Sequence, residues 1–261
     1  MTVELEVAAV TDTGLHRAVN EDSYLAEAPV FLVADGMGGY EAGDRASAAV
    51  VAAFREHLAG HESAELEQVR DALLTADARV ADVASDTIRG AGSTVAGVVL
   101  TTHDGMPFWL VFNVGDSRVY RHDPAGLEQL TIDHSLGQEL IDRGQLRRED
   151  LATFPGRNVI TRAIGASDSM ADSWLLPVVD GERLLVCSDG LHSEISDEDI
   201  RAVLAAAGSP AAAARELVAR ANAHGGRDNI SVVVLDVVGG GLSPEARDDV
   251  VAEDTVDSPA G

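Results

Sequence analysis

Three extended runs follow one another in the middle of this chain with no helical segment between them. They span residues 94–102, 108–114 and 118–122, and short turns at 103–105 and 115–117 separate them. Strands joined by short glycine-containing turns are typical of antiparallel pairing. Residues 108–112 (FWLVF) are apolar at every position, which indicates a strand covered on both faces. The three runs therefore predict an antiparallel meander inside a layered protein.

Strand and helix signals alternate in the rest of the chain. We predict further strands at residues 4–10, 30–34, 183–187 and 230–237, and helices at residues 40–58 and 63–89, the second ending at Gly90. Two more helices have capping signals, because Ser196 precedes three acids and Ser209 precedes Pro210. Since helices come in pairs between groups of strands, we expect an α+β fold with helices outside two sheets.

The charged residues exclude several classes of protein. The chain has 44 acidic and 19 basic residues, a net charge of −25, and every basic residue is arginine. Without lysine the chain cannot be a P-loop nucleotidase, a protein kinase or a Schiff-base enzyme, all of which need that amine. Strong negative charge also opposes binding to nucleic acid or to an anionic membrane. We therefore expect no nucleic-acid partner.

The single cysteine and the apolar segments indicate the compartment. Cys187 is alone, so no intrachain disulfide or thiolate metal cluster can form. The tyrosine-phosphatase thiol mechanism would need arginine six positions later, where Ser193 stands, so Cys187 is predicted to be a buried strand residue. The first ten residues do not resemble a signal peptide, and no apolar run reaches about 18 residues. We expect a monomer in the cytoplasm with no membrane insertion.

The last segment differs in composition from the rest. Residues 239–261 begin with three glycines and contain six acids, one arginine, two prolines and no aromatic residue. Such a composition is typical of a flexible acidic tail. We therefore predict one folded domain over residues 1–238 and a flexible tail over residues 239–261.

Acidic residues lie where predicted strands begin or end beside glycine. They are Asp35 before Gly36, Asp116 after Gly115, Asp189 before Gly190, Asp228 before the last strand, and Glu21 and Asp22 in a loop after the first strand. Carboxylates held at strand ends, with backbone carbonyls nearby, can form an all-oxygen site for hard divalent cations. Taken singly, each acid is better explained as a turn residue, because aspartate bonds to its own backbone there. Several such acids together would repel one another without cations, so the pattern favours a metal site while the spacing alone leaves both explanations open.

Seven short segments carry a resemblance to a known family. In order, they are RAVNED (17–22), VADGMGG (33–39), GST (92–94), NVGDSR (113–118), DHS (133–135), SDGL (188–191) and GRDNI (226–230). Each is weak alone, but their order and spacing resemble the bacterial branch of the PP2C-type metal-dependent serine/threonine protein phosphatases. The resemblance runs from about Leu5 to Val238. It implies a four-layer α-β-β-α sandwich, with two antiparallel sheets flanked by helix pairs.

The resemblance also implies which residues hold metal ions. Asp35 would bridge two Mn²⁺ or Mg²⁺ ions, with the carbonyl of Gly36 on the second ion. Asp189 and Asp228 would complete the first ion's ligands. Asp116, sharing Asp189, would hold a third and weaker ion of the kind found in bacterial members.

Other residues would act on the substrate and on water. Arg17 would bind the substrate phosphate, because a guanidinium can form two parallel hydrogen bonds with it; without the motif a surface role for this arginine is equally open. Glu21 and Asp22 would orient metal-bound waters, with Glu21 as a second-ion ligand in the alternative. Some relatives carry a histidine, proposed as the general acid, where this chain has Met37, which cannot donate a proton. His134 is the nearest motif histidine, and we expect it to shape a loop.

Residues 134–170 resemble the family's mobile flap beside the active site. Five arginines lie in this segment, at positions 143, 147, 148, 157 and 162. A solvated helix face accounts for most of them. The hypothesis is that one or two of them, Arg157 and Arg162 above all, steer phosphopeptides toward the site.

The sequence therefore predicts a protein phosphatase that opposes serine/threonine kinases, with phosphorylated proteins as partners. Two alternatives stay open at this point. One is a non-catalytic family member that binds phosphoproteins, which loss of a metal aspartate would indicate, although Asp35, Asp189 and Asp228 are all present. The other is a metallohydrolase of small phosphoesters.

Overall fold

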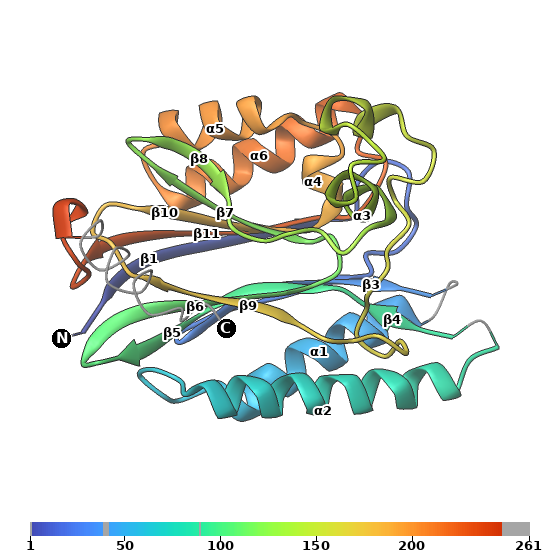
Figure 1. The fold of residues 1–261 in the computed structure, drawn as a ribbon, viewed down its shortest axis with the longest axis horizontal. Helices are drawn as coiled ribbons and strands as arrows, with labels where there is room; N and C mark the ends of the chain where they lie inside the picture. Colours follow the sequence, from blue (N-terminus) through green and yellow to red (C-terminus); the bar gives the residue numbers. More distant parts are fainter. Residues whose placement is uncertain (1, 39–41, 89, 247–261) are drawn as a thin grey trace.

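Two antiparallel sheets lie face to face, and a helix pair covers the outer face of each sheet (Figure 1). The computed structural model describes residues 2–38, 42–88 and 90–246. The layers follow the order helices, sheet, sheet, helices, so the predicted four-layer α-β-β-α sandwich is confirmed. No helix among the described residues is both long enough and apolar enough to cross a lipid bilayer.

Strands from both ends of the chain form the first sheet. In spatial order it contains β1 (Glu4–Asp12), β11 (Ile230–Gly239), β10 (Arg183–Cys187), β7 (Arg118–Asp123) and β8 (Gly126–Gln129). The second sheet contains β2 (Asp22–Glu27), β3 (Val30–Met37), β5 (Val95–His103), β6 (Met106–Val114) and β9 (Asp172–Pro177), and the short β4 (Gly92–Ser93) pairs with β3. All of these pairings are antiparallel. Residues distant in sequence therefore meet at one end of a sheet.

The four long helices lie on the outer faces of the sheets. Helices α1 (Gly43–Leu58) and α2 (Leu66–Ser85) cover the second sheet, whereas α5 (Asp197–Ala206) and α6 (Pro210–His224) cover the first sheet. Both predicted caps are confirmed, because the Ser196 hydroxyl accepts from Asp199 N–H and the Ser209 hydroxyl accepts from Ala212 N–H. Shorter helices are α3 (Leu136–Asp142), α4 (Asp189–His192) and a 3₁₀ helix (Arg148–Thr153).

Three apolar clusters hold the four layers together. One lies between the second sheet and its helices, where the rings of Phe54 and Phe112 stack at 5.0 Å. A second lies between the two sheets and includes Trp109, whose indole N–H donates to Glu182 Oε1 at 2.8 Å. The third joins the first sheet to α5 and α6 and includes Cys187. Cys187 is therefore a buried strand residue, as predicted, and its burial raises the pKa of the thiol.

The predicted three-stranded meander is wrong at its last strand. Strands β5 and β6 form a hairpin, but β7 belongs to the other sheet, where it pairs with β10. The chain crosses between the sheets at Gly115, which has a φ of 106° and leaves no room for a Cβ, because this atom would lie 2.6 Å from Thr94 Cγ2. A glycine turn between apolar runs looks the same in sequence whether the next strand pairs or changes sheet. The crossing places Asp116 at the end of the sandwich.

Three of the strands at sheet edges were missed, whereas the edge strand β1 was predicted at residues 4–10. Strands β2, β8 and β9 each occupy one end of a sheet, and their sequences mix polar and apolar residues. Edge strands are buried on fewer sides, so their hydrophobic pattern is weaker than that of central strands. Asp22, predicted to lie in a loop, is the first residue of β2.

Part of the predicted tail contacts the folded body. Gly241 N–H donates to Asp180 Oδ1 at 2.7 Å, and Leu242 N–H donates to the Val178 carbonyl at 2.8 Å. Strand β11 extends to Gly239. Residues 241 and 242 are therefore hydrogen-bonded to the segment between β9 and β10, and residues 247–261 of the predicted tail lie outside the described residues.

The close packing at Gly97 gives a test of the core. A Cβ on this residue would lie 2.7 Å from Leu32 Cβ and from Phe112 Cζ. We expect Gly97→Ala to lower the free energy of unfolding by about 1–3 kcal/mol, because the Cβ would also lie 2.7 Å from the Phe31 carbonyl oxygen, a backbone atom that cannot move without shifting β3. Urea unfolding followed by circular dichroism measures this. The matched control is Gly208→Ala, where a Cβ meets nothing within 4 Å, and equal urea midpoints for the two variants would contradict the packing argument.

Candidate active site

Five aspartates from both sheets meet at one end of the sandwich. Asp35 lies near the end of β3, Asp22 begins β2, Asp116 lies in the β6–β7 crossing, Asp189 follows β10, and Asp228 precedes β11. Antiparallel pairing explains the meeting, because the end of one strand lies beside the start of the next. Asp22 and Asp35 are direct cross-strand partners. The structure therefore brings together the carboxylates that the sequence singled out.

Asp35 is held by the backbone and side chains of the neighbouring β4–β5 segment. Its N–H donates to Thr94 Oγ1 at 3.1 Å, and its carbonyl accepts from Thr94 N–H at 2.8 Å. Burial raises the pKa of the Asp35 carboxyl well above its usual range, and the charges of Asp22, Asp189, Asp116 and Asp228 raise it further. Asp35 is thus fixed in position and surrounded by like charge.

Asp189 and Asp22 are crowded in the same way. Burial raises the pKa of Asp189 to about 6, and the charge of Asp228 adds to the rise while a hydrogen bond with Asp35 opposes it. The pKa of Asp22 rises to about 7, chiefly through burial, although the Ser188 hydroxyl donates to its Oδ2 at 2.8 Å. Ser188 is a contact that the sequence did not assign, because serine beside a buried strand has no distinctive signal.

Three carboxylate oxygens at this end have no hydrogen-bond partner among the described residues. They are the buried Oδ1 atoms of Asp22, Asp116 and Asp189. Buried anionic oxygens without donors are unfavourable unless a cation satisfies them, and carboxylates are the preferred ligands of Mg²⁺ and Mn²⁺. Within the described ranges, no group of three or more His, Cys, Asp or Glu side chains could hold a metal ion as the side chains are placed. The features that fit divalent cations are therefore the burial, the crowded charge and the oxygens without donors.

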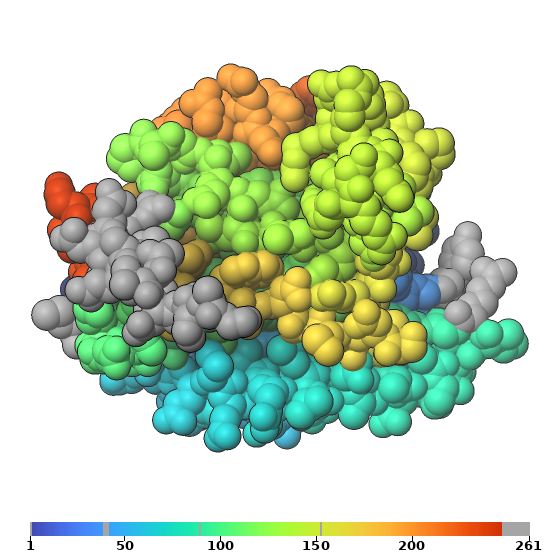
Figure 2. Space-filling model, in the orientation of Figure 1, coloured from blue at the N-terminus to red at the C-terminus, as the bar shows by residue number. Residues whose placement is uncertain are grey.

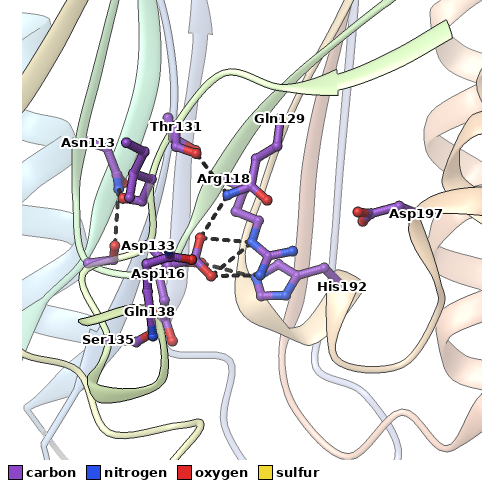
Figure 3. A network of polar contacts seen from close by, with 12 residues as sticks. Asn113, Asp116, Arg118, Gln129, Thr131, Asp133, Ser135, Gln138, His192 and Asp197 are labelled. Carbon is purple, nitrogen blue, oxygen red and sulfur yellow. Dashed lines mark hydrogen bonds and ion pairs between the residues drawn. The ribbon is translucent and has the colours of Figure 1, made fainter. Parts of the chain in front are cut away.

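A buried polar network holds the backbone of Asp116 in place (Figure 3). His192 Nε2–H donates to the Asp116 carbonyl at 3.0 Å, and burial lowers the pKa of His192 to about 3, so its imidazole is neutral. Burial also raises the pKa of the Asp116 carboxyl well above its usual range, and Asp189 and Asp133 add to the rise. His192 is another residue that the sequence did not assign.

An ion pair completes this network. Arg118 Nε and Nη2 donate to Asp133 at 2.9 and 2.6 Å, and Gln129 donates to the same carboxylate at 2.9 Å. The side chains of Arg118 and Asp133 are only 15% and 10% exposed. Arg118 Nη1 also donates to the Tyr120 hydroxyl. The pair therefore ties the β6–β7 crossing to the segment that follows β8, as Figure 3 shows.

Gly36 allows close contact between β3 and the start of α1. A Cβ on Gly36 would lie 1.9 Å from the Gly43 carbonyl oxygen. Its N–H donates to the Glu21 carbonyl at 3.1 Å. The Glu21 carboxylate accepts from Gly43 N–H, and burial is the main cause of its raised pKa. Glu21 and Gly36 therefore lie together with the aspartates.

Arg17 lies at the open side of the site. Its side chain is 49% exposed, and Nη2 lies 2.6 Å from Asp228 Oδ2. An exposed guanidinium beside the carboxylates is placed where a substrate phosphate could reach it. Arg17 is therefore a surface residue that also lies next to the site, so its exposure does not argue against phosphate binding.

His134 is part of the fold and not of the open site. Its Nδ1 accepts from Gly115 N–H at 3.1 Å, so Nε2 carries the proton and donates to Asp172 at 3.1 Å. The ring is buried. The expectation that His134 shapes a loop is confirmed, and Met37 offers no proton donor in its place.

Three of the five flap arginines form ion pairs with acids within or near the flap. Arg143 pairs with Glu139, Arg147 with Asp150, and Arg162 with Asp168 and with Asp172 at 2.8 Å. Figure 2 shows the flap, in yellow-green, on the surface at the right of the view. A steering role for Arg162 would therefore have to act alongside its ion pairs. A cavity of about 620 Å³ between α2, β6 and residues 167–173, which include the end of the flap, is lined by none of the predicted metal or phosphate ligands.

Known proteins share this fold and these motifs. The family model "Protein phosphatase 2C" matches residues 16–223. The chain is 37% identical over 243 residues to the serine/threonine protein phosphatase PstP of Mycobacterium tuberculosis, covering 91% of this chain but 46% of PstP. It is 32% identical to the serine/threonine phosphatase stp of Listeria welshimeri, covering 87% of this chain and 93% of stp. The chain thus spans about half the length of PstP and nearly all of stp.

A solved structure agrees with the sequence comparison. The crystal structure of the catalytic domain of PstP in complex with two manganese ions has a TM-score of 0.82 and 32% identity to this chain, covering 91% of this chain and all of that domain. The fold, the ordered motifs and the relatives agree. The chain belongs to the PP2C family of serine/threonine protein phosphatases.

Proposed function

We propose that this chain hydrolyses phosphoserine and phosphothreonine in proteins with a metal-activated water. The observation that carries the proposal is the meeting of five aspartates at one end of a PP2C sandwich, where burial and mutual repulsion raise the pKa values of Asp22, Asp35, Asp116 and Asp189. A site that concentrates negative charge needs cations before it can accept a dianionic phosphate.

Asp35, Asp189 and Asp228, with the carbonyl of Gly36, would hold two core divalent ions, and Asp116 with Asp189 would hold a weaker third. The manganese ions bound by the PstP catalytic domain support this assignment, and Mg²⁺ has the same preference for oxygen ligands. When bound, such ions supply positive charge that lowers the pKa of water and stabilises charge on the phosphoryl oxygens.

The chain's own residues position the substrate and the water. Arg17 binds the phosphate through its planar guanidinium, which Asp228 orients from 2.6 Å. Asp22 and Glu21 accept hydrogen bonds from water and set its direction of attack, with Glu21 as a further ligand in the alternative. Met37 cannot donate a proton, so the leaving alkoxide takes its proton from water. The barrier is lowered mostly by positioning and by charge stabilisation.

Two alternatives weigh less than this proposal. A non-catalytic phosphoprotein-binding role is disfavoured because Asp35, Asp189 and Asp228 are all present and lie near one another. Hydrolysis of small phosphoesters would use the same site, and the substrate panel below separates it from protein dephosphorylation. The proposal also includes serine/threonine kinases and their substrates as partners, a cytoplasmic location and a monomer.

Replacing Asp35 tests the metal site. We expect Asp35→Asn to lower kcat/KM on phosphopeptides on the order of 100-fold or more, because the amide removes the bridging negative charge. Activity with Mn²⁺ on a panel of phosphopeptides and small phosphates, and Mn²⁺ binding by isothermal titration calorimetry, measure the effect. The matched control is Asp71→Asn on the exposed face of α2, which should leave both quantities unchanged. Activity that survived chelation or Asp35→Asn would overturn the mechanism.

Charge reversal in the flap tests its role in substrate choice. We expect Arg157→Glu and Arg162→Glu to lower kcat/KM for phosphopeptides about tenfold, because steering depends on local charge, and to spare small aryl phosphates. Arg215→Glu on the exposed face of α6 is the control. Steady-state kinetics on both substrate types give the comparison, and an equal loss on both would refute steering. Since Arg162 pairs with Asp172, thermal melting should accompany that variant.

A further inference from the structure

One buried side chain fastens the loop that carries Arg17. Asn229 is 5% exposed and follows Asp228 directly. Its Nδ2 donates to the Thr13 carbonyl at 2.9 Å and to the Val19 carbonyl at 3.0 Å, and its Oδ1 accepts from Glu21 N–H at 2.8 Å. Both amide hydrogens and the amide oxygen are thus used on one loop.

The three contacts lie at both ends of the segment between β1 and β2. Thr13 precedes Arg17, whereas Val19 and Glu21 follow it, so a single carboxamide closes the loop on which Arg17 lies. Leu15 N–H adds a bond to the Gly226 carbonyl at 2.7 Å. Because the side chain of Arg17 is exposed, little packing around it fixes its position. The position of its backbone therefore depends on these loop contacts.

We propose that Asn229 is a positioning residue for phosphate binding. It holds the Thr13–Glu21 loop so that Arg17 lies over the carboxylates and Glu21 lies beside Gly36. This inference rests on the proposed phosphate-binding role of Arg17. Neither the motif resemblance nor the charge pattern assigned any role to Asn229, because its three partners are backbone groups that a sequence does not identify.

Only a short carboxamide fits these contacts. The site presents two carbonyl acceptors and one N–H donor, which match the two donors and one acceptor of asparagine. Leucine has a similar shape but no polar atoms, so it keeps the packing and removes all three bonds. The buried loop groups would then lack partners, and the loop would shift or loosen.

A double-mutant cycle with Arg17 tests the proposal. We expect Asn229→Leu to raise KM for a phosphopeptide about tenfold, because a small displacement of a binding group weakens the substrate contact. In an Arg17→Ala background the same change should have little further effect on KM, since Asn229 acts through Arg17. Mn²⁺ affinity measured by calorimetry should change less than about twofold, because the backbone N–H of Asn229, which donates to Asp228 Oδ1, remains.

The controls separate positioning from general stability. Ser209→Ala removes a helix cap remote from the site and should lower the melting temperature without raising KM. If Asn229→Leu does not fold, Asn229→Ser, which keeps one donor, replaces it and should raise KM in the same direction. Additive effects of Asn229→Leu and Arg17→Ala, or an unchanged KM in the folded Asn229 variant, would overturn the inference while the role of Arg17 stood. An unchanged KM in Arg17→Ala alone would instead overturn the phosphate-binding role itself.

Discussion

Repulsion among buried carboxylates is the constraint on which the rest of this structure depends. Burial disfavours the charged form of an acid, and a second acid nearby disfavours it again. Here both effects act on Asp22, Asp35, Asp116 and Asp189. The fold must therefore oppose this repulsion with contacts elsewhere. The stabilising contacts are those of the three apolar clusters between the four layers, which extend through the sandwich well beyond the site.

Around the carboxylates, neutral hydrogen-bonding groups and one ion pair fix positions without cancelling the charge. The Ser188 hydroxyl bonds to Asp22, the Thr94 backbone and hydroxyl hold the Asp35 backbone, and neutral His192 holds the Asp116 carbonyl. The guanidinium of Arg118 forms its ion pair with Asp133, which lies beside the aspartate cluster. The site therefore keeps its negative charge available for cations, and Arg17 is a basic group at its open side. Under the proposed function, cations and Arg17 would bind the phosphate group in a chain that has no lysine.

Much of this structure follows from the sequence, and the limits have identifiable causes. Central strands and capped helices were predicted because their hydrophobic period and capping residues are local signals. Asp35, Asp189 and Asp228 were singled out as candidate ligands because each adjoins a buried strand. The partner strand of β7 was predicted wrongly, because a turn at Gly115 does not reveal which sheet the next strand joins. The edge strands β2, β8 and β9 were missed because polar residues interrupt their hydrophobic pattern, whereas the edge strand β1 was predicted; Asn229 was missed because its partners are distant backbone groups.

The three-residue crossing between β6 and β7 has a consequence for the geometry of the whole end of the sandwich. Each sheet contributes carboxylates, so the separation between those of one sheet and those of the other depends on how far apart the sheets lie. The crossing at residues 115–117 is a covalent spacer of fixed length at that end, clamped by His134 on one side and by Arg118 and Asp133 on the other. The length of the backbone crossing thus sets the distance between the carboxylates of the two sheets. Inserting or deleting one residue there would change that distance although every residue of the site stayed the same.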